Sequence, residues 1–385
     1  MTIIVFILIL SVLIFVHELG HFIAAKKAGI LVEEFGFGLP PRIWGKKIGE
    51  TIYSINALPI GGFVKLYGED GENQRLTPST QHPKNRAYYE KSIFRRLTVL
   101  LAGVSMNLLL AIVCFSILYF ISGIPTKTGK VLVGGVVDNS PAKTAGIKEE
   151  DQIISVDSQK VYQSEEFLKL IKEKEGKKVL LEISRENNNP CKKVSDSVLG
   201  GMATGEFEFQ CQGENLILSV VPRKSPPEGQ GPLGIAIFDT ELKKYPIWQM
   251  PFLGVREGFK ESLSWGKMIL SSLKTMLATL ILKGQLPKDI AGPVGIFKIT
   301  NTAVQAGYLA VLQFLGILSV NLAIINILPF PALDGGRLIF LGYELVFRKK
   351  ANPKWEASIN SVGMALLLAL MVLITINDVL RLVVH

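Results

Sequence analysis

Long apolar runs alternate with polar segments along this chain, and four of the runs are long enough to cross a lipid bilayer. A hydrocarbon core about 30 Å thick requires roughly 20 mostly apolar helical residues. The runs that meet this length are about 3–25, 97–122, 309–333 and 358–381, the third of which includes two asparagines. We therefore expect a polytopic α-helical membrane protein with about four transmembrane helices.

The polar region after the first run is punctuated by glycine and proline, which excludes a spanning helix there. It reads FGFGLPPRIWG and then INALPIGGFVKLYGED, and short apolar runs between Ile52 and Tyr67 predict strands in a hairpin. Irregular backbone within a membrane needs cover from protein or from a water cavity. We expect a membrane-associated β-hairpin packed against the helices, with a surface cytoplasmic loop as the alternative.

A second polar region, about 129–222, has the composition of a small α+β domain. Short β-branched runs in it are separated by turn residues, and Ser164 followed by acidic residues and FLKLI indicates the start of a helix. Residues 187–213 interrupt the strands as a long loop or an added hairpin. Beyond this domain, about 250–284 fits an interfacial amphipathic helix, and Gly292–Gly295 marks a turn before the third span.

The net charge of +9 changes the interpretation little, because the basic residues cluster beside the apolar runs. Lys26, Lys27, Arg95 and Arg96 border the first polar region, and Arg348 to Lys350 follow the third run. This is the pattern that sets membrane orientation, so we expect a lipid bilayer and no nucleic acid as partner. Both basic loops are predicted to face the cytoplasm, with the α+β domain outside.

Two of the three cysteines, Cys191 and Cys211, fall in the predicted outer domain, and Cys114 lies in the second run. An oxidising compartment permits a disulfide between the first two. Two unpaired thiols are an equally good interpretation of the sequence alone.

The candidate chemistry begins with HELGH at 17–21, inside the first apolar run. Residues four apart lie about 40° from one another around a helix, so His17 and His21 can reach one metal ion. In this spacing the imidazoles bind Zn²⁺, and Glu18 between them takes a proton from the bound water. The alternative, in which the three groups only satisfy one another, is costly because each ionisable group in a span costs several kcal/mol unless it is paired or liganded.

A hydrolytic zinc site usually has three protein ligands, so a third must come from elsewhere in the chain. Asp334 is the best candidate because it follows an apolar helix that Pro329 and Pro331 break, in the segment ILPFPALDGGR. Gly335 and Gly336 let the chain turn, and a carboxylate at such a break can reach inward. A helix-capping aspartate near the cytoplasmic face is the alternative.

HELGH in a first span together with NILPFPALDGGR in a later one resembles the site-2 proteases, which are intramembrane zinc metalloproteases. The FGFG and PIGGFVKLYGED segments are similar to that family's membrane-associated loop, and four spans with one insert after the second resemble its bacterial sigma-factor-regulating branch. The resemblance implies that His17, His21 and Asp334 bind zinc and that Glu18 is the catalytic base. It also matches Asn321 and Asn326 to asparagines that the family uses near the scissile segment, with the joining of helices as an equally good interpretation of both. In the predicted hairpin, Gly61, Gly62 and Phe63 are the other expected substrate contacts.

Within residues 129–222, VGGVVDNSPAKTAGIKEEDQIISVD resembles a PDZ domain, a module that accepts an extended peptide along a strand edge. The expected organisation has four parts: an N-terminal membrane part (1–128), the PDZ-like domain (129–222), a linker with the interfacial helix (223–300), and a C-terminal membrane part (301–385). The resemblance places the protein in a bacterial inner membrane as a multi-pass protein, with the PDZ-like domain extracytoplasmic and the active site near the cytoplasmic side.

The expected function is cleavage of the transmembrane segments of single-span proteins, with peptides or freed termini as partners of the PDZ-like domain. An anti-sigma factor, a remnant signal peptide and another single-span protein are equally compatible as substrates, and the need for a prior cut stays open. A metal transporter is one alternative, but the second and fourth runs offer almost no further ligands, only Asp378 near one end. A catalytically inactive PDZ membrane scaffold is the other.

Overall fold

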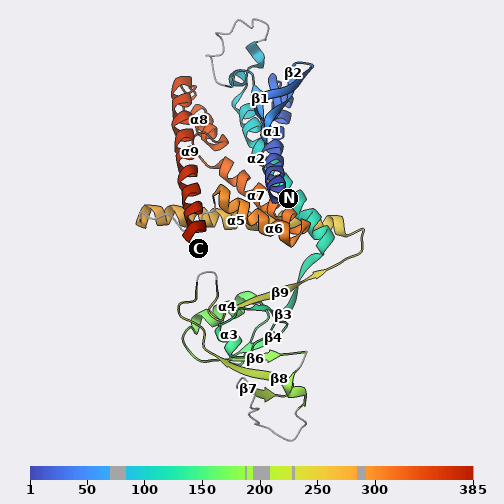
Figure 1. Ribbon diagram of the computed structural model, residues 1–385. Helices are drawn as coiled ribbons and strands as arrows, with labels where there is room; N and C mark the ends of the chain where they lie inside the picture. The colour runs from blue at the N-terminus through green and yellow to red at the C-terminus, as the bar shows by residue number, and fades with distance from the viewer. Residues whose placement is uncertain (70–83, 187–188, 194–208, 228–229, 284–291, 385) are drawn as a thin grey trace. The chain divides into compact units, whose positions relative to one another are not determined.

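The computed structural model describes residues 1–69, 84–186, 189–193, 209–227, 230–283 and 292–384. The chain forms two compact units, the first made of residues 1–122 and 246–385 and the second of residues 123–245 (Figure 1). The helices and strands of the first unit are α1 (Thr2–Lys27), β1 (Val32–Ile48), β2 (Thr51–Leu66), η2 (Lys84–Arg86), η3 (Tyr88–Glu90), α2 (Ile93–Ser122), α5 (Met250–Lys283), α6 (Pro293–Ala306), α7 (Tyr308–Ile327), α8 (Asp334–Phe347) and α9 (Pro353–Val384).

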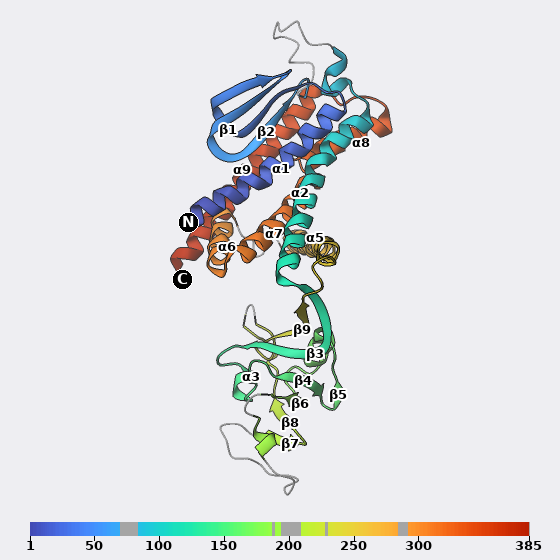
Figure 2. The same ribbon diagram turned by 90° about the vertical axis from the view of Figure 1, so that its right-hand side faces the viewer.

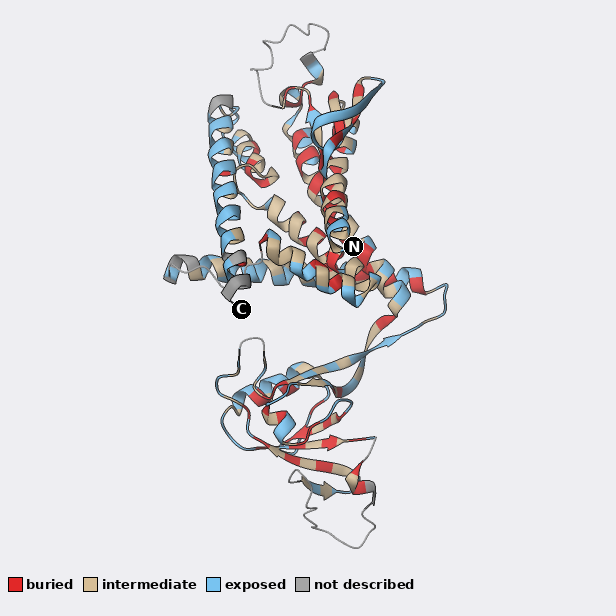
Figure 3. Ribbon diagram, in the orientation of Figure 1, coloured by how far each residue is buried: buried red, intermediate tan, exposed pale blue. Residues whose placement is uncertain are grey.

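Four helices among the described residues are long and apolar enough to span a membrane: α1, α2, α7 and the part of α9 from Trp355 to Ile376. They correspond to the four predicted runs. Only 6% of the α9 window is buried within the protein, and Figure 3 shows most of this helix as exposed. An apolar helix with so little protein cover is suited to lipid rather than to water.

The first two helices cross at close range because one of them carries a glycine at the contact. A Cβ atom added to Gly20 on α1 would lie 2.4 Å from the carbonyl oxygen of Ala102 on α2. Small residues of this kind let helix backbones approach in membranes. Figure 2 shows α1 and α2 close together at their upper ends and diverging toward their lower ends.

The strand structure predicted near residues 52–67 is confirmed. The sheet also includes residues 32–48, a segment whose glycines and prolines did not predict a continuous strand. Phe35 pairs with both Val64 and Tyr53, so the start of β1 lies between two segments of β2. The sheet packs on α1: the rings of Phe22 and Phe35 stack at 4.7 Å, and Ser11 Oγ donates to the carbonyl oxygen of Pro59 at 2.6 Å.

Helix α5 corresponds to the predicted amphipathic segment and is not among the candidate spans. It packs against α2 and α7, and the contact with α2 requires two glycines. A Cβ atom on Gly258 would lie 2.6 Å from Ser116 Oγ and 2.8 Å from the carbonyl oxygen of Ile112, and one on Gly254 would lie 2.9 Å from the carbonyl oxygen of Ser116.

The prediction of a turn over Gly292–Gly295 is wrong, because a 14-residue helix, α6, already begins at Pro293 and includes Gly295. Its first N–H groups are capped from a distant part of the chain. Asp378 on α9 accepts hydrogen bonds from the backbone N–H groups of Gly292 at 3.0 Å and Gly295 at 2.9 Å. A carboxylate at a helix N-terminus satisfies the orphan donors there.

The second unit is a mostly antiparallel α+β domain. Its elements are β3 (Ile124–Val136), α3 (Pro141–Thr144), β4 (Gln152–Val156), β5 (Gln159–Lys160), α4 (Ser164–Glu173), β6 (Val179–Ser184), η4 (Pro190–Lys193), β7 (Phe209–Gln212), β8 (Asn215–Val220) and β9 (Ile235–Lys243). The strands form one sheet in the order β7-β8-β6-β4-β3-β9, with β5 beside β4. Phe167 and Ile171 of α4 lie in its apolar core.

The disulfide that the sequence left open is present between Cys191 and Cys211. It closes the segment predicted as an insertion, 187–213, of which residues 187–188 and 194–208 lie outside the described part of the structure. Within the same unit, the buried guanidinium of Arg185 donates from Nε and Nη2 to the two carboxylate oxygens of Asp151, each at 2.7 Å.

Candidate metal centre

The two histidines of HELGH lie on one face of α1 and are both buried. Their Nε2 atoms are 3.1 Å apart, and the rings meet edge to face. Two imidazole nitrogens at this distance need a proton or a cation between them. The spacing four residues apart therefore places both rings where one ion can bind both.

Asp334 completes a triangle with this pair across 313 residues of chain. Its Oδ2 atom lies 3.0 Å from His17 Nε2 and 3.2 Å from His21 Nε2. Ligands at about 2.0–2.2 Å from a tetrahedral Zn²⁺ are about 3.3–3.5 Å from one another, close to the three separations observed. The two imidazoles and one carboxylate also form a donor set that zinc prefers, so the residues fit this metal.

Asp334 reaches the histidines because the chain turns back closely after α7. Glycine is required there: a Cβ atom on Gly335 would lie 1.9 Å from the carbonyl oxygen of Leu328, and one on Gly336 would lie 2.5 Å from that of Phe330. Asp334 is the first residue of α8, so the backbone of residues 328–331 lies against the first turn of the same helix that carries the carboxylate.

The far nitrogens of both imidazoles face partners on α2. His21 Nδ1 lies 2.8 Å from the carbonyl oxygen of Val99, which accepts the Nδ1 proton and leaves Nε2 free to bind a metal. His17 Nδ1 lies 3.2 Å from the amide of buried Asn107, whose Oδ1 atom has no partner among the described residues. Amide orientation is assigned from the hydrogen-bond network. Turning the amide places Oδ1 where it accepts the His17 Nδ1 proton, the tautomer that leaves Nε2 free to bind a metal.

A glycine on α2 makes room for the rings. A Cβ atom on Gly103 would lie 2.5 Å from His21 Nε2 and 2.7 Å from His17 Cε1. Val99, Gly103 and Asn107 are four residues apart and so face α1 together. Sequence reasoning missed all three, although the spacing of a glycine and an asparagine within the second apolar run was a signal that could have identified this face.

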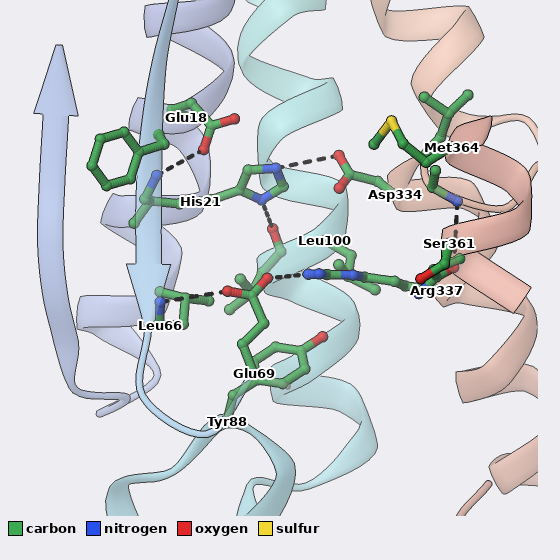
Figure 4. Close-up of a pocket in the computed structure, with 16 residues that line it drawn as sticks. Glu18, His21, Leu66, Glu69, Tyr88, Leu100, Asp334, Arg337, Ser361 and Met364 are labelled. Carbon is green, nitrogen blue, oxygen red and sulfur yellow. Dashed lines mark hydrogen bonds and ion pairs between the residues drawn. The ribbon is translucent and has the colours of Figure 1, made fainter. Parts of the chain in front are cut away.

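Glu18 lies in a cavity of about 630 Å³ that His21 and Asp334 also line (Figure 4). Its Oε2 atom accepts a hydrogen bond from the backbone N–H of Val64 on β2 at 3.2 Å. The carboxylate is therefore directed toward the strand, and its side chain lines the same cavity as two of the three candidate ligands. Glu18 is not one of the three residues whose ligand atoms converge, so it is free to serve in another role.

The predicted substrate-contact residues separate into two groups. Phe63 lines the cavity, and Asn326 on α7 has its Nδ2 atom 3.4 Å from His17 Nε2. Asn321 is half-buried on the same helix; its side chain makes no hydrogen bond with a described residue, and it is not among the residues lining the cavity. Gly61 and Gly62 are buried where β2 packs on α1, and a Cβ atom on Gly61 would lie 2.9 Å from the Ile14 side chain.

Comparison with known proteins identifies the family. The model of Peptidase family M50 matches residues 5–370, nearly the whole chain. This chain belongs to peptidase family M50. Among its relatives, a protein of Clostridium perfringens that carries a zinc metalloprotease name is 36% identical, with 99% of each chain covered. The zinc metalloprotease RasP of Oceanobacillus iheyensis is 30% identical, and the regulator of sigma-W protease RasP of Bacillus subtilis is 29% identical, each with 99% of both chains covered.

The M50 assignment confirms the resemblance to the site-2 proteases. The protein is a membrane-embedded zinc metalloprotease, and zinc is the metal that its family uses. Similarity extends over both units of the chain rather than over the HELGH helix alone, since the matched residues run from the start of α1 into α9.

Proposed function

We propose that this M50 protease cleaves the transmembrane segments of single-span membrane proteins, as a RasP-type enzyme of regulated intramembrane proteolysis. The observation that carries the proposal is the convergence of His17, His21 and Asp334 within helices that are apolar enough to span a bilayer. The name of the Bacillus subtilis relative, a regulator of sigma-W protease, favours an anti-sigma factor as substrate. A remnant signal peptide is the second substrate class.

In this proposal His17, His21 and Asp334 hold the metal, and Glu18 is the catalytic base. Zinc bound in this way lowers the pKa of a water from 15.7 toward about 7 and polarises a carbonyl group. Glu18 accepts the proton of the attacking water and delivers it to the leaving amine. Asn107 and the carbonyl of Val99 hold the two imidazoles in the tautomer that ligation requires.

The substrate must unwind, because a transmembrane helix hides its carbonyl groups in its own hydrogen bonds. Residues 62–66 of β2 are paired with β1 on one side, and Val64 directs its N–H into the cavity on the other. We assign this edge as the strand to which the unwound segment adds. Phe63 contacts the segment in the cavity, and Asn326 holds its opened backbone by amide hydrogen bonds.

The second unit supplies a substrate-admission module in this proposal. Its sequence resembles a PDZ domain, and its disulfide between Cys191 and Cys211 suits an oxidising compartment. We therefore assign the unit to the outside of a bacterial inner membrane and the active site to the cytoplasmic side. Peptides or freed termini of substrates are its proposed ligands.

The test is a matched set of variants of the purified full chain in detergent, incubated with a single-span substrate. Glu18→Gln removes the base but no ligand, so zinc content should stay at one per chain while cleavage falls by about 10²–10⁴-fold. Asp334→Ala should lower both zinc content and cleavage. Full proteolysis by Glu18→Gln would refute the assigned base, and a metal-free active wild type would refute the proposed centre.

A further inference from the structure

Besides Glu18 and the candidate metal ligands, the cavity has a second charged feature that the proposed chemistry does not use. Glu69 and Arg337 form an ion pair there, and both line the cavity together with Tyr88 (Figure 4). The side chain of Glu69 is 21% exposed and that of Arg337 is 33% exposed, so both are largely shielded from solvent. Removing two charged groups from water has a desolvation cost that is offset only when both groups are well hydrogen-bonded. A largely buried ion pair beside a metal centre is therefore a candidate for a specific role.

Glu69 connects the ion pair to the strand that borders the cavity. One carboxylate oxygen accepts from Arg337, and the other, Oε2, accepts from the backbone N–H of Leu66 at 3.5 Å. Leu66 lies two residues after Val64, and alternate residues of a strand direct their N–H groups to the same side. Glu18 and Glu69 therefore accept hydrogen bonds from two successive N–H donors, those of Val64 and Leu66, on the cavity edge of β2.

Arg337 connects the ion pair to the metal centre. It lies three residues after Asp334, which places the two side chains on neighbouring positions of the first turn of α8. Glu69 thus ties the end of β2 to the same helical turn that carries the third ligand. Gly335 and Gly336 fix how closely this turn approaches residues 328–331, but those contacts do not connect it to β2.

We propose that the Glu69–Arg337 ion pair is a positioning device that holds Asp334 against the histidine pair at a fixed distance from the β2 edge. The inference rests on the proposed function, in which Asp334 binds zinc and β2 receives the substrate. Neither residue touches the metal ligands or the reacting atoms. Their effect passes through α8 on one side and through the backbone of Leu66 on the other.

A positioning role and a purely electrostatic effect of the two charges predict different changes in zinc affinity when each charge is removed. Glu69→Gln leaves the positive charge of Arg337 near the metal, and Arg337→Gln leaves the negative charge of Glu69 there. If the pair acted only through its field, the first change would weaken zinc binding and the second would strengthen it. If the pair positions Asp334, both changes weaken zinc binding, by about the 10–100-fold typical of groups that orient metal ligands.

The experiment measures the zinc dissociation constant of the full chain in detergent by competition with a chromogenic chelator. We expect both single variants to bind zinc 10–100-fold more weakly, the double variant Glu69→Gln/Arg337→Gln to be no weaker than either, and Arg337→Lys to retain most of the affinity. The matched control is the Arg96–Glu344 pair, with an N···O distance of 2.6 Å, which joins α2 to α8 ten residues beyond Asp334.

Loss of that control pair through Glu344→Gln should lower the thermal stability of the protein and leave the zinc dissociation constant of the folded protein unchanged. Wild-type zinc affinity in both Glu69→Gln and Arg337→Gln, or opposite changes in the two, would overturn the inference alone. A wild-type chain that binds no zinc would overturn the proposed function and this inference with it.

Discussion

The clearest quantitative expectation concerns Gly103, because it touches the metal centre without contributing a ligand. In Gly103→Ala, the new methyl group would lie 2.5 Å from His21 Nε2 and 2.7 Å from His17 Cε1. Comfortable carbon contacts are about 3.5–4.0 Å, so the rings or the helices must separate by about 1 Å. Metal ligands tolerate deviations of only about 0.2 Å. We expect zinc affinity to fall by about 10–100-fold, the loss typical when metal ligands are no longer correctly oriented.

The same substitution should also cost about 1–3 kcal/mol of stability, as overpacking usually does. The assay is zinc content by mass spectrometry together with the cleavage rate. The matched control is Gly342→Ala on α8, where an added Cβ atom has nothing within 4 Å and alanine favours the helix by about 1 kcal/mol. A Gly103→Ala protein with full zinc occupancy and the wild-type rate would show that the rings are not held against α2 as described.

Two further predictions concern parts of the first unit away from the metal. Gly258→Ala should lower the thermal unfolding temperature in detergent, because its Cβ atom would lie 2.6 Å from Ser116 Oγ. Gly266→Ala on the same helix is the control and should be neutral or stabilising, because its Cβ atom would have no neighbour nearer than 3.8 Å. Equal effects of the two substitutions would contradict the described packing of α5 on α2. Hydrogen bonds from Arg86 lower the pKa of Glu50 to about 2 from 4.5, so its contribution to stability is present above pH 4.5 and is lost as the pH falls toward 2. The stability difference between wild type and Glu50→Gln, followed by thermal unfolding against pH, should close over that interval, and a difference that is independent of pH would contradict this assignment.

The three residues that converge at the candidate metal centre could be predicted, because ionisable groups inside an apolar span are energetically costly and therefore few. Three ionisable groups at 17–21 within an apolar span have few explanations, and a spacing of four fixes their common face. Asp334 followed from the helix break at Pro329 and Pro331. Each inference needed only local sequence and a general rule about which groups a membrane tolerates.

The supporting residues on α2 could not be predicted, because they depend on how two helices cross. Gly103 and Asn107 matter only once Gly20 has brought α2 against α1 in one register, and helix periodicity alone allows several registers. The start of α6 was missed for a similar reason. The segment from Gly292 to Gly295 is typical of a turn, and the carboxylate that caps a helix there is more than 80 residues away on α9.

The hydrogen bond between Glu18 and Val64 joins the two halves of the proposed reaction. The Val64 N–H has one proton to donate, and Glu18 Oε2 accepts it at 3.2 Å. A substrate strand that adds to this edge offers its own carbonyl oxygen to the same donor. In the proposed function, strand pairing therefore releases the Glu18 carboxylate at the moment when a peptide bond enters the cavity. Under this proposal, recognition of an extended segment and release of one carboxylate oxygen of the base occur in the same step.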